Sequence, residues 1–116
     1  MFKFIIRDKN DIIPKVKKLH IIINENIDDL IFPEGVEEIS FCISFNHSID
    51  KVKFPSSLKV LNFGDSFNQN ISKVKFPNNL EEINFGEDFN QSISKVKFPS
   101  SLKAIFFGDN FNQSID

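Results

Sequence analysis

Residues 67–88 read FNQNISKVKFPNNLEEINFGED, and this stretch decides the fold because it recurs along the chain. A unit of 22 residues cannot bury its own apolar side chains, so consecutive copies must stack on one another. The sequence therefore predicts one solenoid domain over residues 1–116, which begins with an irregular stretch, 1–22. The repeats that follow are 23–44, 45–66, 67–88 and 89–110, with a partial repeat at 111–116.

The irregular N-terminal stretch still carries part of the pattern. The run from Ile13 to Ile21 matches the later Phe-Pro-x-x-Leu-x-x-Leu-x-Phe with one residue fewer after the proline, so we expect a degenerate first coil. Ahead of it, Phe2–Ile6 consists of residue types that favour strands. This segment is predicted to pair along the first edge of the stack and to cap it.

Each repeat carries two short apolar segments separated by turn residues. In residues 67–88 the first contains Val74 and Phe76 and the second contains Ile83 and Phe85, alternating with polar residues as in a half-buried strand. A proline, Pro77 in this repeat, recurs in each unit, and no window has the spacing of an amphipathic helix. We therefore predict an all-β, right-handed solenoid with two short parallel strands per coil, hence two parallel sheets, and little or no helix.

Three recurrent features are predicted to support the stack. Asparagines in one column are expected to turn inward and satisfy backbone groups at a bend, whereas the glutamines beside them are expected to be exposed. Charges of alternating sign in a second column favour pairing between coils. A recurrent glycine indicates a positive φ or a close backbone approach. The members are Asn24, Asn46, Asn68, Asn90 and Asn112; Gln69, Gln91 and Gln113; Lys17, Glu37, Lys59, Glu81 and Lys103; and Gly64, Gly86 and Gly108.

The pattern Phe-Asn-Gln-x-Ile followed by Phe-Pro-x-x-Leu-x-x-Leu-x-Phe-Gly resembles the FNIP repeat, a member of the leucine-rich-repeat superfamily found in amoeboid protists and large DNA viruses. The resemblance covers Ile23 to Asp116, and a weaker match extends back to Ile13. It implies a curved solenoid of the leucine-rich type. It also implies a protein-interaction role, since such repeats typically present one sheet to a partner.

Composition excludes several classes of function. A formal net charge of −2 and a pI near 5.7 do not fit a generally basic nucleic-acid binder, and no apolar run is long enough to span a membrane. Fifteen Phe without Tyr or Trp indicate core rings rather than binding hot spots. The single Cys42 and a start unlike a signal peptide predict a cytoplasmic location, which is the host cytoplasm or the virion if the chain is viral.

No catalytic or metal-binding pattern is evident in the sequence. His20, Cys42 and His47 belong to different coils and lack the spacing of metal ligands. Ser, Asp and Glu occupy turn positions that recur from repeat to repeat, whereas a catalytic group would occur once. We therefore expect no enzyme activity, no metal and no cofactor.

One set of lysines on the outer face of the first apolar segment is not explained by stacking. Equivalent lysines lie one above another, which costs repulsion unless a partner offsets it, so we predict a binding surface for an acidic protein segment rather than for phosphates or nucleic acid. The alternative is that they keep this face soluble, with Asp65, Glu87 and Asp109 compensating. This lysine ridge consists of Lys51, Lys53, Lys73, Lys75, Lys95 and Lys97.

The end of the stack offers a second possibility. Phe107, Phe111 and Ile115 end the repeats without a recognisable polar cap, so a second copy could stack there and form a homo-oligomer. Two functions therefore stay open at this point. The first is a protein-interaction module whose partner the sequence does not identify, and the alternative is a self-associating structural building block.

Overall fold

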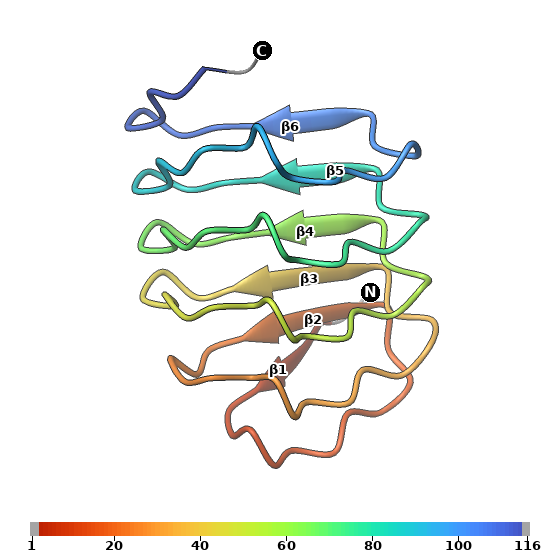
Figure 1. The fold of residues 1–116 in the computed structure, drawn as a ribbon. Helices are drawn as coiled ribbons and strands as arrows, with labels where there is room; N and C mark the ends of the chain where they lie inside the picture. The colour runs from red at the N-terminus through yellow and green to blue at the C-terminus, as the bar shows by residue number, and fades with distance from the viewer. Residues whose placement is uncertain (1–2, 115–116) are drawn as a thin grey trace.

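Figure 1 shows the computed structural model of the chain, in which residues 3–114 are described. Six short strands lie side by side in chain order as one parallel sheet, and one turn of a solenoid joins each strand to the next. The described residues contain no helix. The predicted all-β solenoid with parallel strands is therefore confirmed. The strands are β1 (Lys3–Ile6), β2 (Lys18–Ile21), β3 (Glu38–Phe41), β4 (Val60–Asn62), β5 (Glu82–Asn84) and β6 (Ala104–Phe106).

The prediction of two sheets is wrong, because only the second apolar segment of each repeat forms a strand. The first segment runs back across the coil between two turns. These are closed by hydrogen bonds from Val74 N–H to Ile71 O and from Leu80 N–H to Pro77 O, both at 3.2 Å. The turns direct N–H groups into their own coil and the proline has none to donate, so no ladder to the next coil forms. We call these stretches the return segments, residues 10–14, 27–33, 49–55, 71–77 and 93–99.

The segment that the sequence predicts as a cap strand contains β1, which lies at the first edge of the sheet. β1 pairs in parallel with β2, with Phe4 opposite Leu19 and Ile6 opposite Ile21. Ile6, Leu19 and Ile21 are fully buried, so this strand covers the first edge of the core. Phe2, which the sequence assigns to the same strand, lies outside the described residues.

The core is built of equivalent side chains that stack along the solenoid. In one column of phenylalanines, the ring centroid of Phe67 lies 6.3 Å from that of Phe45 and 6.2 Å from that of Phe89. In an adjacent column, the centroid of Phe63 lies 5.3 Å from that of Phe85 and 4.2 Å from that of Phe67. Since these five rings are at most 6% exposed, the predicted role of phenylalanine in the core is confirmed.

The recurrent glycines allow neighbouring coils to approach closely. A Cβ at Gly86 would lie 2.5 Å from the carbonyl oxygen of Gly64, and one at Gly108 would lie 2.4 Å from that of Gly86. These three positions do not have positive φ; among the described residues only Gly35 does, at 103°. Of the two explanations for the recurrent glycine, close backbone approach is therefore the correct one.

The asparagine column is hydrogen-bonded from coil to coil, but it lies at the surface. The Asn90 N–H and the Gln91 side-chain amide both donate to Asn68 Oδ1, each at 2.9 Å. The predicted inward orientation is wrong, because buried phenylalanines such as Phe67 fill the core side of this bend and the asparagines are exposed. The predicted exposure of the glutamines is also wrong, since Gln91 is half-buried against the column. The asparagines do satisfy backbone N–H groups, as predicted.

The column of alternating charges lies immediately before the strands. Glu81 N–H donates to Lys59 O at 2.9 Å and Lys103 N–H donates to Glu81 O at 2.8 Å, so equivalent residues stack on consecutive coils. Within residues 3–114 the column forms one ion pair, between Lys103 Nζ and Glu81 Oε1 at 3.8 Å, and both side chains are exposed. Such a pair contributes about 0–1 kcal/mol, so the column favours one arrangement of the coils without adding much stability.

Candidate partner-binding surface

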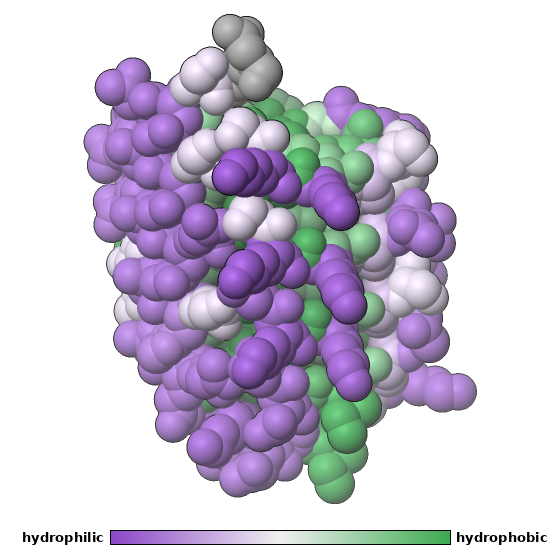
Figure 2. Space-filling view, in the orientation of Figure 1, coloured by the Kyte–Doolittle hydropathy of each residue, from purple (hydrophilic) through white to green (hydrophobic). Residues whose placement is uncertain are grey.

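The lysine ridge lies on the return segments, on the side of the coil opposite the sheet, and all six lysines are exposed. The sequence placed them on a strand, which is incorrect. Figure 2 views this side and shows hydrophilic side chains repeated along the stack, with hydrophobic side chains exposed beside and below them. Val74 and Phe76 are buried although Lys73 and Lys75 next to them are exposed. The return segment thus keeps the alternation of an extended chain without a hydrogen-bonded ladder, and the lysines still point outward.

No carboxylate oxygen lies within 4.0 Å of the ammonium nitrogen of a ridge lysine in the described part of the chain. The ion pair within 4.0 Å that occurs there joins Lys103 and Glu81, which are not part of the ridge. The ring centroids of Phe76 and Phe98, which flank ridge lysines on consecutive coils, lie 5.9 Å apart, so equivalent lysines are close neighbours. The ridge is therefore a strip of lysines over three coils that forms no ion pair within 4.0 Å in residues 3–114, although Glu34 lines a hollow together with Lys53.

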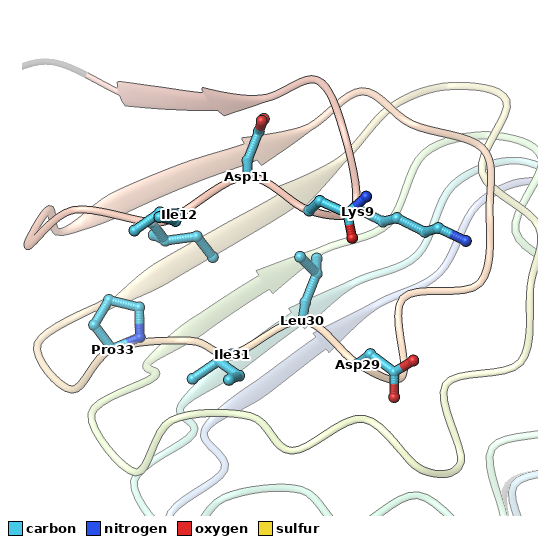
Figure 3. A pocket seen from close by; sticks show the side chains of 9 residues that line it. Lys9, Asp11, Ile12, Asp29, Leu30, Ile31 and Pro33 are labelled. Atoms are coloured by element: carbon cyan, nitrogen blue, oxygen red, sulfur yellow. The ribbon is translucent and has the colours of Figure 1, made fainter.

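A groove lies next to the N-terminal end of the ridge, between the return segments 10–14 and 27–33. It was not predicted from the sequence. Its volume is about 410 Å³. Figure 3 shows Ile12, Ile31 and Pro33 toward one end of the groove and Lys9 and Asp29 toward the other. The apolar and charged parts of the lining are thus separated along its length.

The groove exists because Asp11 interrupts an apolar column. In later return segments the equivalent position holds a buried Leu30 or Val52. The Asp11 carboxylate instead accepts hydrogen bonds from Arg7 N–H at 2.9 Å and Asp8 N–H at 3.1 Å, which closes the turn after β1. Because this position holds an aspartate instead of a leucine or valine, no apolar side chain from it fills the space between these two return segments.

Two isoleucines border the groove at positions that lysines occupy in the ridge. Ile12 is 90% exposed and Ile31 is 85% exposed. The groove could have been found from the sequence by two breaks in the repeat pattern. Asp11 stands in the apolar column, and these isoleucines stand in the column that lysines occupy in later coils. Adjacent exposed isoleucines over a hollow are typical of interaction surfaces rather than of a surface built for solubility.

The outer face of the sheet carries a second polar column that was not predicted. Asn62 Nδ2 donates to Ser40 Oγ at 3.1 Å, and Asn84 Nδ2 donates to Asn62 Oδ1 and, at 2.8 Å, to Glu82 Oε2. The recurrence of Asn62 and Asn84 one repeat apart was its sequence signal. Because these amides bond to one another, fewer of their donors and acceptors are free for a partner than on the lysine ridge.

The histidines and the cysteine are not brought together. Burial and, to a smaller extent, the charge of Lys3 lower the pKa of His20 from its ordinary value. His47 Nε2 lies 3.0 Å from Asn24 O, in a different part of the solenoid. Within residues 3–114 there is no group of three or more His, Cys, Asp or Glu side chains able to hold a metal ion. The same residues include no helix with the length and hydrophobicity needed to cross a membrane.

The C-terminal end of the stack is less covered than its interior. Phe107 and Phe111 are half-buried, whereas their equivalents one repeat earlier, Phe85 and Phe89, are 6% and 0% exposed. Ile115, which was predicted to contribute to this end, lies outside the described residues. Within residues 3–114, the rings of Phe107 and Phe111 are therefore more exposed than their equivalents in the interior of the stack.

Comparisons with known proteins agree with this architecture. A family model described as FNIP Repeat matches residues 45–88 and 89–116. The chain is also similar to the crystal structure of CroV588, described as a novel circular LRR protein, with a TM-score of 0.81 and 34% sequence identity. That match covers 90% of this chain and 16% of the other, so the chain spans a small part of the relative's length. A comparison with curated proteins gives no match.

Proposed function

Because the chain belongs to the FNIP repeat family, of the leucine-rich-repeat type, we propose that it is a non-enzymatic protein-interaction module whose contact surface is the lysine ridge. Repeat proteins of this type are commonly interaction modules. The observation that carries the proposal is the stacking of six exposed lysines with no carboxylate paired to them. A strip of this kind attracts acidic segments and orients their approach.

A purely solubilising role explains the ridge less well than binding does. Equivalent lysines on consecutive coils place like charges on neighbouring rungs of the stack, which costs repulsion. The same molecule shows how a solvated column avoids this cost, since Lys59, Glu81 and Lys103 alternate in sign. A ridge that keeps only positive charge is therefore better suited to an acidic partner.

The partner is proposed to be protein rather than single-stranded nucleic acid. Recognition of unpaired bases relies on exposed aromatic side chains on which the bases stack. Phe76, which follows the ridge residue Lys75 on its return segment, is 8% exposed and offers little ring surface. Acidic side chains need no such platform.

Neutralising four ridge lysines is expected to reduce capture of partner proteins from a nuclease-treated lysate roughly thirtyfold. This magnitude corresponds to four exposed ion pairs of about 0.5 kcal/mol each. Capture on the immobilised chain, measured by quantitative mass spectrometry, checks it, and the acidic proteins should be the ones lost. The substitutions are Lys73→Gln, Lys75→Gln, Lys95→Gln and Lys97→Gln.

A matched control changes the net charge by the same amount on other parts of the surface. It should retain wild-type capture if the position of the lysines matters rather than their number. Equal capture by the wild type and the ridge variant would remove the ridge from the proposal. The control substitutions, all at exposed lysines, are Lys15→Gln, Lys17→Gln, Lys59→Gln and Lys103→Gln.

The second candidate function is self-association through the C-terminal end, and it is favoured by the more exposed rings there. Phe89, one coil further in, is fully buried because Phe111 stacks on it with centroids 6.1 Å apart, whereas Phe111 is only half-buried. Among the described strands β6 pairs with β5 alone, and its other edge has no strand partner there. A second copy stacked head to tail would satisfy both the edge and the rings.

If the end self-associates, the average mass measured by multi-angle light scattering should rise above that of the monomer with increasing concentration. Phe111→Lys should return the mass to that of the monomer, because it removes the ring on which the next copy stacks. Ile43→Lys serves as the control, since Ile43 is 67% exposed, lies on an earlier coil away from β6 and belongs to neither phenylalanine column. A wild-type mass equal to the monomer at every concentration would exclude this function.

A further inference from the structure

We propose that the groove and the lysine ridge form one docking surface for an extended acidic segment that carries an apolar anchor at one end. The inference rests on the proposed function and specifies the chemistry of its partner. The apolar anchor would occupy the groove between Ile12 and Ile31. The acidic residues would lie along the ridge, toward the C-terminal coils.

The groove has the size and lining of a site for one or two apolar side chains. Its volume of about 410 Å³ lies within the range of about 300–1,000 Å³ typical of ligand pockets. Ile12 and Ile31, at 90% and 85% exposure, leave most of their apolar surface in water in the free protein. Covering that surface would favour binding through the hydrophobic effect.

The groove and the ridge are continuous. A second hollow, of about 230 Å³, lies between the next two return segments, and both Ile31 and Lys53 line it. Ile31 therefore borders the groove on one side and the first coil of the ridge on the other. A chain leaving the groove past Ile31 meets Lys53 across a hollow that Glu34 also lines. The Glu34 carboxylate there accepts hydrogen bonds from Ser56.

The distribution of charge on this surface determines where the apolar and the acidic residues of the partner's segment lie. Asp29 and Lys9 both lie at the charged end of the groove and have opposite charges, so an acidic residue of the partner is attracted less there than along the ridge. The neighbouring Asp11 carboxylate is held by backbone N–H groups of Arg7 and Asp8. Acidic residues therefore fit over the ridge, and uncharged apolar residues fit the groove.

The length of the segment follows from the spacing of the return segments. Phe32 and Phe54 have ring centroids 6.2 Å apart, and Phe76 and Phe98 lie 5.9 Å apart. Four steps, from the coil of Ile12 to that of Lys97, thus span roughly 24 Å, which about seven extended residues cover at ~3.3 Å each. A short linear segment is sufficient.

The test uses two labelled peptides and measures binding by fluorescence anisotropy. The anchored peptide is Leu-Leu-Gly-Glu-Asp-Glu-Asp, made in this order and in reverse, since the groove admits either chain direction. The unanchored peptide replaces both leucines with glycine. In one of its two orders the anchored peptide is expected to bind the wild type about tenfold more tightly than the unanchored one, as burial of apolar side chains predicts.

Ile31→Lys discriminates sharply because it extends the ridge by one coil while it removes one wall of the groove. We expect it to weaken the anchored peptide about tenfold and to strengthen the unanchored one. Ile43→Lys adds the same charge at another exposed isoleucine, 67% exposed, and should leave the preference for the anchored peptide unchanged. Lys53→Gln combined with Lys75→Gln should weaken both peptides, unlike Lys59→Gln combined with Lys103→Gln.

Three outcomes would overturn the inference. Equal affinity for the anchored and unanchored peptides would show that the groove takes no part. Single-stranded oligonucleotides that bind more tightly than the peptides would assign the ridge to nucleic acid, and a dimer of the free protein that Ile12→Ser and Ile31→Ser abolish would assign the groove to a second copy. Loss of lysate capture in the ridge variant, alongside equal peptide affinities, would leave the proposed function standing without this partner chemistry.

Discussion

Phe67→Ala is expected to lower the free energy of unfolding by about 3–5 kcal/mol. The ring is fully buried, and its centroid lies 6.3 Å and 6.2 Å from those of Phe45 and Phe89 on the coils either side. Phe63 packs on it at 4.2 Å from the adjacent column. The deletion therefore leaves a cavity bounded by rings from neighbouring coils, which cannot close without moving whole coils. Urea denaturation followed by circular dichroism measures the change.

The controls delete the same ring at sites of decreasing burial. Phe111→Ala lies in the same column at the less covered end, and an intermediate loss is expected there. Phe106→Ala removes a ring that is 56% exposed, so its effect should stay within about 0.5 kcal/mol. A loss at Phe67 no larger than at Phe106 would contradict the stacked-ring account of the core.

Gly86→Ala is expected to cost about 3 kcal/mol, at the upper end of the range for overpacking. The added methyl would lie 2.5 Å from Gly64 O and 2.6 Å from Asp65 Cα, both of them backbone atoms of the previous coil. Relief requires the two coils to separate, which strains bonds such as that from Asp88 N–H to Asp65 O at 2.9 Å. The midpoint of thermal unfolding should fall accordingly.

Substitutions at two other positions distinguish steric crowding at Gly86 from the loss of glycine's backbone freedom. Asn78→Ala, at an exposed turn position of the same repeat, should leave the melting temperature nearly unchanged. At Gly35 a Cβ meets nothing within 4 Å, but φ is 103°, so Gly35→Ala is destabilising through backbone strain alone. If the Gly86→Ala and Asn78→Ala variants have the same melting temperature, the close approach of the coils does not limit stability.

The overall architecture could be predicted from the sequence because the repeat period determines which residues stack. The number of sheets could not. Val74 and Phe76 alternate with lysines in the same way that Ile83 and Phe85 alternate with polar residues, yet only the second segment pairs with its neighbours. Alternation reports which side chains are buried. Whether the backbone forms a ladder depends on the turns around Pro77, whose hydrogen bonds the side-chain pattern does not reveal.

The regular part of the candidate surface, the lysine ridge, was predicted from the sequence, whereas the groove was not. The exposure of the lysine ridge follows from its alternation with buried residues in every coil. The groove depends instead on one irregular coil, in which the Asp11 carboxylate turns back to bond Arg7 and Asp8 and leaves a place in the core unfilled. A single exception such as this carries no periodic signal. The asparagines were misplaced for a related reason, because a polar column that satisfies backbone groups can do so from the exposed side of a bend.

The column of alternating charges also bears on how such a chain changes in length. Loss of the repeat 67–88 would bring Lys59 onto the coil next to Lys103, whereas loss or duplication of two repeats together would preserve opposite neighbours. Each exposed pair contributes about 0.2–1 kcal/mol, so the preference for opposite charges on neighbouring coils is weak. Changes by an even number of repeats therefore keep opposite charges on neighbouring coils, whereas changes by an odd number place like charges side by side.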